Sequence, residues 1–279
     1  MAAVLASGRT SIHIAAAEPH VVDLARCLVK MGARIKGAGS HEIEVEGVRV
    51  LRGVRHRVIP DPIEAMTLAA ALAATRGRGI IKGVRPNDCE LPILRMREAG
   101  VPVENQKSKA GKWNILQREP RAAGERAIIK NQKLADLIIK PALRLSAIPY
   151  PGIKTRPYPG FPSDLQAPFS VLATQLTGAT LIHETLYEGR LKHVEELKKM
   201  GANAVIMDPH RALVIGPTAL YAREFQSLDL RAGATLMIAA LVAEGESVIH
   251  DAYTIDRGYE RIEEKLQRLG AEIKRVSNE

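Results

Sequence analysis

Cysteine is nearly absent from this sequence. Cys27 and Cys89 are the only two among 279 residues, and neither stands in a CxxC or Cys/His spacing. Two such residues cannot build a disulfide framework, and their spacing excludes a cysteine-based metal site. We interpret both as structural thiols of a protein in a reducing compartment.

Long apolar runs and targeting segments are lacking as well. The longest clear apolar run covers residues 237–243, whereas a membrane-spanning helix needs roughly 18 residues. The first six residues are mostly apolar but lack the basic region of a secretory signal. We therefore expect a cytoplasmic protein that does not enter a membrane.

Metal and cofactor motifs are also missing. The eight histidines show neither HExxH nor clustered spacing. Residues 77–79 read Gly-Arg-Gly but lack the lysine and serine of a Walker loop, and no dinucleotide-binding fingerprint is present. The sequence predicts neither a metal site nor a cofactor.

Positive charge, by contrast, is concentrated in one place. The formal net charge is +9 at pH 7, and residues 104–156 alone hold twelve basic and four acidic side chains. The rest of the chain is close to neutral. The protein is therefore expected to be a neutral body with one basic segment, not a uniformly basic nucleic-acid coat.

A pattern of helix, glycine and strand recurs four times along the chain. Each copy has two helical stretches that end at a glycine and lead into a β-branched run. The glycine pairs, spaced by 23–25 residues, are Gly8 and Gly32, Gly77 and Gly100, Gly178 and Gly201, and Gly245 and Gly270. A glycine that ends a helix adopts a positive φ, so we expect each of them to turn a helix directly into a strand.

The same intervals predict the domain organisation. The second glycines of successive copies are 68, 101 and 69 residues apart, and the long middle interval coincides with the basic segment. We place a basic insertion at about residues 118–145, with an amphipathic helix over 125–140 that ends at Pro141. Residues 60–279 then form a three-unit domain. Residues 1–59 form the closing portion of a preceding domain, because the first copy has few helical residues before its glycine.

Three longer segments resemble the enolpyruvyl transferase family. They read FPSDLQA at 161–167, DLRAGA at 229–234 and IDRGYERIEEKLQRLGA at 255–271, with support from VIPDPIEAMT at 58–67 and ETLYEGR at 184–190. The resemblance is greatest to the branch that acts on UDP-N-acetylglucosamine in peptidoglycan synthesis. It implies the α/β (α+β) class: inverse α/β barrels of pseudo-threefold repeats, with the active site in the cleft between two domains. This chain would hold one complete domain and the last part of a second.

The chemistry of that family sets requirements that the sequence can be checked against. Its members transfer the enolpyruvyl group of phosphoenolpyruvate to the sugar 3-hydroxyl by addition and then elimination of phosphate. The reaction needs a base for the hydroxyl, and cations for a carboxylate and a phosphate. The resemblance assigns the base to Asp164. Ser163 and Gln166 also fit a capping box, which predicts a helix N-terminus that favours this carboxylate.

Three arginines are candidates for the cations. Arg190, Arg231 and Arg257 stand at matching places in the repeats, and a planar guanidinium suits bidentate binding of carboxylate and phosphate. The resemblance implies that they hold phosphoenolpyruvate, mainly its carboxylate end, and that Leu186 contacts the uridine nucleotide. We expect Asp164 and the arginines to converge on one crevice.

Several functions of the family have no counterpart in the sequence. Missing are a lysine–asparagine pair, a loop with a Gly-Gly-Cys or Gly-Gly-Asp acid, and the arginine after it that binds phosphate. One acid–base interaction typically carries a factor of about 10²–10⁴ in rate. We expect a C-terminal portion with little activity alone, whose turnover a companion N-terminal fragment would restore.

Two alternatives stay open. An enolpyruvyl transferase of the shikimate pathway uses the same donor with a different acceptor. A non-catalytic relative could instead bind nucleic acid or an acidic partner through its basic segment. Only Trp113 and Tyr150 interleave with the cations there, which makes a weak platform for stacking bases. Nucleic acid is therefore the less favoured partner.

Overall fold

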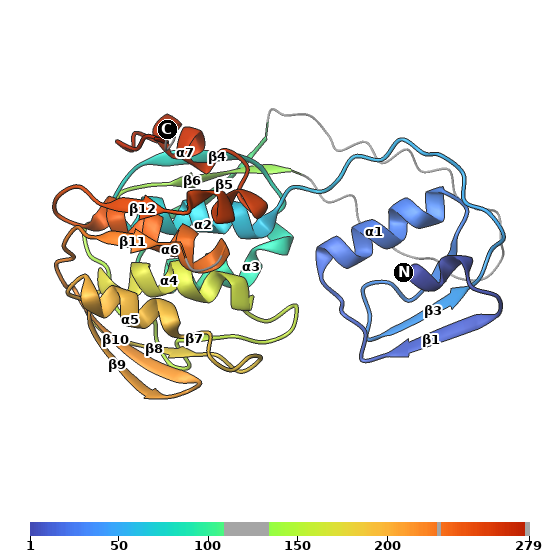
Figure 1. Cartoon of the computed structure of the whole chain (residues 1–279), viewed down its shortest axis with the longest axis horizontal. Coiled ribbons are helices and arrows are strands. Elements are labelled where there is room, and N and C mark those ends of the chain that lie inside the picture. The colour runs from blue at the N-terminus through green and yellow to red at the C-terminus, as the bar shows by residue number, and fades with distance from the viewer. Residues whose placement is uncertain (109–133, 228–229, 277–279) are drawn as a thin grey trace.

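The protein has a small N-terminal lobe and a larger body (Figure 1). The structure, a computed structural model, describes residues 1–108, 134–227 and 230–276, apart from the side chains of Leu230 and Arg231. Residues 47–61 contain no helix or strand and connect the lobe to the body. Residue 60, where the sequence predicts a domain boundary, lies in this segment, and the division into domains remains a prediction.

The N-terminal lobe is one antiparallel sheet with a helix against it. Its elements are η1 (Ala2–Leu5), β1 (Arg9–His13), α1 (Pro19–Lys30), β2 (Arg34–Lys36) and β3 (Glu42–Glu46), and the strand order is β1-β3-β2. The outward side of the sheet carries ion pairs such as Arg9–Glu44. The core cluster of the lobe has five buried apolar residues, namely Val4, Ala15, Ala33, Ile43 and Val45, and Ala25 of α1 is buried outside this cluster. This lobe therefore buries little apolar surface of its own.

The larger body consists of three successive units. The first contains α2 (Pro62–Ala74), β4 (Gly79–Val84), η2 (Pro86–Asp88), α3 (Glu90–Glu98), β5 (Val103–Lys107) and β6 (Ala135–Ile139). The second contains β7 (Ile153–Lys154), α4 (Ser163–Thr174), β8 (Gly178–His183), α5 (Lys192–Lys199), β9 (Asn203–Asp208) and β10 (Arg211–Gly216). The third contains β11 (Glu224–Gln226), α6 (Leu230–Val242), β12 (Val248–His250), η3 (Ala252–Arg257) and α7 (Ile262–Arg268).

Three helices form the centre of this body. Helices α2, α4 and α6 pack against one another, and the sheets lie around them (Figure 1). All residues of α2 from Ala65 to Ala74 are buried. Only a helix that is apolar on nearly every side can occupy such a position. Helix α2 begins where the Asp61 carboxylate accepts from the backbone N–H groups of Ile63 (2.7 Å) and Glu64 (3.4 Å), as an N-cap does.

Each unit contributes its own sheet. The strand orders are β4-β6-β5, β7-β8-β10-β9 and β11-β12. The fold is thus mixed α/β, and no sheet among the described residues closes on itself. In the third unit no strand follows Gly270: residues 271–276 were expected to form one but have no regular structure. There the Arg275 guanidinium binds Asp256 and Glu263 instead.

Seven of the eight predicted glycines take the expected positive φ, with values from +86° to +112°. Gly77 does not. The left-handed position after α2 falls one residue earlier, on Arg76 (φ 52°). The register of this helix end was therefore wrong by one residue, because the sequence offers a glycine close to the stop but not at it.

The predicted helix over 125–140 is wrong where the structure describes it. Residues 135–139 form β6, the central strand of its sheet, between β4 and β5; residues 109–133 lie outside the described residues. The extra chain stands between β5 and β6, whereas only Pro209 and His210 separate the equivalent strands β9 and β10. No described helix is both long and apolar enough to cross a membrane.

Candidate functional site

Asp164 lies at the exposed N-terminal end of the buried helix α4. Its side chain is 37% exposed, whereas every other residue of α4 is buried. The preceding Phe161 is buried and meets Phe169 of the same helix edge to face, with ring centroids 5.0 Å apart. This aromatic contact fixes how the chain enters the helix. The FPSD segment therefore presents one carboxylate from a rigid support.

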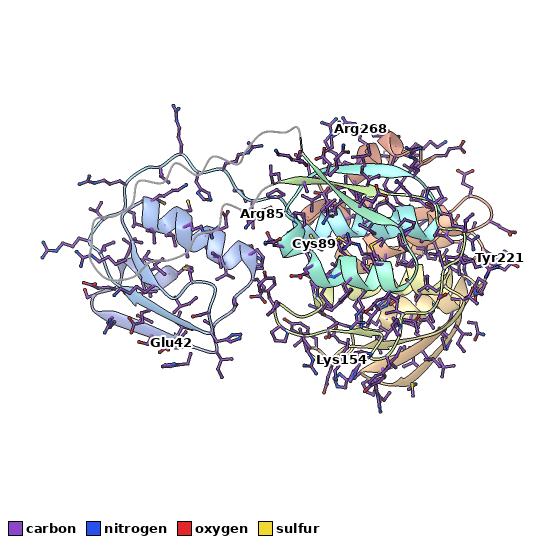
Figure 2. The ribbon with its side chains drawn as sticks, turned by 180° about the vertical axis from the view of Figure 1, so that it is seen from behind. Glu42, Arg85, Cys89, Lys154, Tyr221 and Arg268 are labelled. Atoms are coloured by element: carbon purple, nitrogen blue, oxygen red, sulfur yellow. The ribbon has the colours of Figure 1, made fainter. Side chains whose placement is uncertain are left out.

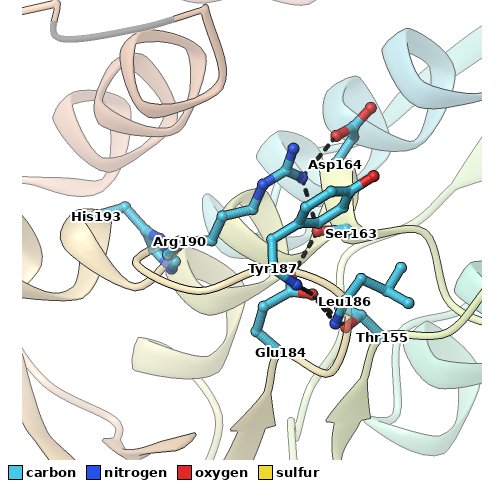
Figure 3. A network of polar contacts seen from close by, with 8 residues as sticks. All are labelled: Thr155, Ser163, Asp164, Glu184, Leu186, Tyr187, Arg190 and His193. Carbon is cyan, nitrogen blue, oxygen red and sulfur yellow. Dashed lines mark hydrogen bonds and ion pairs between the residues drawn. The ribbon is translucent and has the colours of Figure 1, made fainter. Parts of the chain in front are cut away.

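Arg190 lies beside this carboxylate. It follows β8 in the loop that leads to α5, and its Nη1 is 3.2 Å from Asp164 Oδ1 and 2.8 Å from Ser163 Oγ (Figure 3). Its Cζ lies 4.0 Å from the centre of the Tyr187 ring, in cation–π range. Buried His193 holds the backbone of the same residue, with Nδ1 3.1 Å from Arg190 O. Two of the predicted residues thus meet.

A buried glutamate, Glu184, holds the loop that carries Arg190. Glu184, directly after β8, is 0% exposed. Its Oε1 accepts from Thr155 Oγ1 (2.8 Å) and from the backbone N–H groups of Leu186 (2.8 Å) and Tyr187 (3.3 Å); its Oε2 accepts from Ser163 Oγ at 2.6 Å. Sequence reasoning missed this residue. The available indication was a carboxylate placed directly between an apolar strand and a glycine-containing loop.

The predicted capping box at the start of α4 is wrong. Pro162 occupies the N-cap position, where no side chain caps the helix, because the Ser163 hydroxyl is directed to Glu184. Gln166 is 1% exposed, and its Nε2 has no hydrogen-bond partner in the part of the chain that the structure describes. Ser163 therefore belongs to the polar network of the site and does not cap the helix.

Leu186 lies in the same loop. Its backbone is held by Glu184, while 37% of the residue is exposed. The apolar side chain is thus available at the surface next to Tyr187 (Figure 3). Its expected contact with a nucleotide remains a prediction.

The other two arginines are on neighbouring elements. Arg231 is the second residue of α6, and its side chain is outside the described part. Arg257 is the exposed last residue of η3, which packs on α6, and α6 in turn packs on α4. The elements are contiguous, and the convergence of the guanidinium groups on Asp164 remains a prediction.

A second polar cluster lies where the body faces the N-terminal lobe, near Arg85 and Cys89 (Figure 2). Arg85 Nε and Asp88 Oδ2 form a buried ion pair at 3.2 Å. Burial raises the pKa of Asp88, an effect that Arg85 and Arg26 oppose. Burial, and then the charge of Arg85, lower the pKa of Arg26 on α1. A side chain of the lobe thus lies within electrostatic reach of the body.

Cys89 is a structural thiol in a closed environment. Burial, followed by the negative charges of Asp88 and Asp61, raises its pKa to about 12. Such a group stays protonated and unreactive near neutral pH. Within the part of the chain that the structure describes, no group of three or more His, Cys, Asp or Glu side chains is placed to hold a metal ion.

Comparison with known proteins adds a family to this geometry. The family model of EPSP synthase (3-phosphoshikimate 1-carboxyvinyltransferase) matches residues 1–266. UDP-N-acetylglucosamine 1-carboxyvinyltransferase 1 of Caldanaerobacter subterraneus subsp. tengcongensis is 43% identical over 99% of this chain and 59% of its own length. The enzyme of that name from Xanthobacter autotrophicus is 42% identical over 99% of this chain and 58% of its own.

A solved structure supports the fold independently. The enolpyruvyl transferase NikO from Streptomyces tendae superimposes with a TM-score of 0.75 at 23% sequence identity, over 99% of this chain and 58% of that one. The chain therefore spans somewhat under two thirds of the proteins it matches. On the family model and the sequence identities, the chain belongs to the EPSP synthase family of enolpyruvyl transferases.

Proposed function

We propose that the chain forms part of a UDP-N-acetylglucosamine 1-carboxyvinyltransferase and supplies one wall of its active site. The observation that carries this proposal is the contact between Asp164 of α4 and Arg190 of the loop after β8, in a chain 41–43% identical to enzymes of that name. The proposed role is in the cytoplasm, in peptidoglycan synthesis and thereby in cell wall formation, cell shape and division.

The chemistry assigns a role to each side chain. Asp164 takes the proton of the sugar 3-hydroxyl while the hydroxyl oxygen adds to C2 of phosphoenolpyruvate and a proton is added at C3. Loss of that C3 proton and of phosphate then restores the double bond. Arg190, Arg231 and Arg257 hold the anionic donor, mainly its carboxylate, because fixed cations stabilise charge without reorganisation. Leu186 packs against the uridine nucleotide.

The arrangement of units supports a finer description of the fold. Three helices at the centre with sheets outside them agree with an inverse α/β barrel of pseudo-threefold repeats over residues 60–279. Residues 1–59 would be the closing portion of a first domain. Their small core agrees with a lobe that is completed by further polypeptide.

The test is phosphate release from phosphoenolpyruvate and UDP-N-acetylglucosamine. The 279-residue chain is assayed alone and with the part of the Caldanaerobacter relative that it does not cover. We expect little or no turnover alone and turnover with the companion, lost in Asp164→Asn. Normal turnover by the chain alone would contradict the need for a companion. Turnover with shikimate 3-phosphate, and none with the UDP-sugar, would move the proposal to the alternative acceptor.

The nucleic-acid alternative is tested with a deletion in the basic segment. A deletion of residues 118–145 would remove β6, the central strand of its sheet, so the deletion should cover residues 109–133. Steeply salt-dependent binding of DNA or RNA by the wild type that this deletion abolishes would favour the alternative.

A further inference from the structure

We infer that Glu184 is a positioning residue that fixes, through Ser163 and Tyr187, which edge of the Arg190 guanidinium is presented to an anionic ligand. The inference deepens the proposed function and rests on it for the identity of the ligand. Its geometric part stands on the contacts of this chain alone.

The first observation is the set of partners around the Glu184 carboxylate. The residue is fully buried, and among the described residues its carboxylate has four contacts, which come from hydroxyl or backbone N–H groups and not from a cation. A buried carboxylate is costly unless its oxygens are hydrogen-bonded and its charge is balanced. The charged donor closest along the network is Arg190, one hydrogen bond further on.

The direction of the bridging hydrogen bonds follows from donor chemistry. A guanidinium can only donate, so Ser163 Oγ must accept from Arg190 Nη1 (2.8 Å). The single hydroxyl hydrogen of Ser163 is then directed to Glu184 Oε2 (2.6 Å). The chain of contacts therefore runs from the guanidinium to the serine to the buried carboxylate, without an alternative orientation.

A second route connects the same two groups. Glu184 Oε1 accepts the backbone N–H of Tyr187, and the ring of Tyr187 lies under the Arg190 guanidinium. The serine thus fixes one nitrogen of the guanidinium, and the ring fixes its plane. Figure 3 shows Ser163 between Glu184 and the Arg190 guanidinium, with the Tyr187 ring beside the guanidinium.

The consequence concerns the remaining donors of Arg190. The two hydrogens of Nη1 serve Ser163 and Asp164. No acceptor for Nε or Nη2 is found among the residues that the structure describes. These two nitrogens form the side edge of the guanidinium, which matches a carboxylate or phosphate with two parallel hydrogen bonds. Through these contacts, Glu184 leaves this edge of the guanidinium available to bind the carboxylate of phosphoenolpyruvate.

The test measures the guanidinium directly, in the 279-residue chain without ligand. Nitrogen NMR resolves the two Nη groups of an arginine when rotation about Nε–Cζ is slow, and Arg190→Lys assigns the signal. We expect slow rotation in the wild type and rotation about tenfold faster in Glu184→Gln, whose amide would give Ser163 a second donor in place of its acceptor. Glu195→Gln, on the exposed face of α5, should leave the rate unchanged.

Ser163→Ala is the second variant, because it keeps the bonds of Glu184 to Thr155 and the backbone. It should also speed rotation, and Ser163→Thr should restore the slow rate. Wild-type rotation of Arg190 in a folded Glu184→Gln or Ser163→Ala protein would overturn the inference.

Titration of the same proteins with phosphoenolpyruvate and UDP-N-acetylglucosamine separates this inference from the proposed function. If the Arg190 signals respond as expected and the wild type, with its companion, binds neither compound, the proposed function fails and the positioning role stands. If Glu184→Gln changes neither ligand binding nor the rotation rate of the Arg190 guanidinium, the positioning role fails and the proposed function stands.

Discussion

Tyr259 and Thr67, 192 residues apart in the sequence, meet hydroxyl to hydroxyl at 3.1 Å inside the protein. Lys265, on the following helix α7, forms an ion pair with Glu64 one turn earlier on α2. The long segment 255–271 is therefore partly a clamp that fastens the third unit to the first. This segment therefore holds residues that pack the third unit against the first, as well as Arg257.

Removal of the tyrosine hydroxyl should weaken this clamp. Tyr259→Phe leaves the Thr67 hydroxyl buried without a partner, which costs about 1–3 kcal/mol in the free energy of unfolding. Urea denaturation followed by circular dichroism measures the change. Tyr253→Phe is the matched control because that residue is 68% exposed; equal losses in the two variants would contradict the clamp.

Glycine at position 76 should stabilise the protein. Arg76 adopts φ 52°, a conformation that costs a side-chain-bearing residue about 1–2 kcal/mol. Glycine avoids this cost but loses about 0.5–1 kcal/mol through the flexibility of the unfolded chain. Arg76→Gly is therefore expected to gain about 0.5–1 kcal/mol and raise Tm. Arg78→Gly, exposed and without a positive φ, should give no gain; a gain of the same size there would remove the explanation.

The buried thiol makes stability depend on alkaline pH. Because the pKa of Cys89 is raised to about 12 in the folded protein, the folded state favours the thiol over the thiolate. The stabilisation is fully present below about pH 9, near the pKa of an unfolded cysteine, and is lost as pH rises toward 12. Unfolding free energies measured from pH 8 to 11 should fall less steeply in Cys89→Ala than in the wild type.

Alkylation gives an independent measure of the same burial. At pH 8, iodoacetamide should leave Cys89 unmodified in the folded protein and modify it in urea. Mass spectrometry of the two cysteine peptides distinguishes it from the half-buried Cys27. Rapid modification of Cys89 in the native protein would show that its buried environment opens to solvent and would contradict this expectation.

Loss of the candidate base should affect turnover more than folding. In the chain supplemented with its companion, Asp164→Asn should lower kcat by about 10²–10⁴, the usual contribution of a general base. Melting temperature should stay close to that of the wild type, because the ion pair between Asp164 and Arg190 is partly exposed and such pairs contribute only about 0–1 kcal/mol. Glu195→Gln serves as the control variant, and an unchanged kcat in Asp164→Asn would remove the aspartate from the reaction.

The sequence predicted the repeat well where backbone geometry alone decides the structure. Gly178 and Gly201 are turned as expected, because few residues other than glycine tolerate that φ. The prediction from the sequence was wrong at β6, where the spacing of Leu134, Leu137 and Ile138 is that of an apolar helix face. The buried residues 135, 137 and 139 instead follow the alternation of a strand. Short apolar runs carry both periods, and only the pairing with β4 and β5 decides between them.

The site shows a similar division. Asp164 and Arg190 stand in recognisable segments and meet in the structure. The bond of Glu184 to Ser163 could not be predicted, because it depends on how β8 and α4 are placed side by side. A hydroxyl at the start of a helix reads as a cap unless the position of the neighbouring carboxylate is known.

The place of the extra residues has a practical meaning. Lys107 and Ala135 are paired partners at the ends of β5 and β6, so the two ends of the added segment are held close together by the sheet. A connection between two paired strand ends tolerates replacement of its residues by another sequence. A reporter peptide or a small folded module could be grafted there while helix α4 and the loop before α5, which carry Asp164 and Arg190, keep their support.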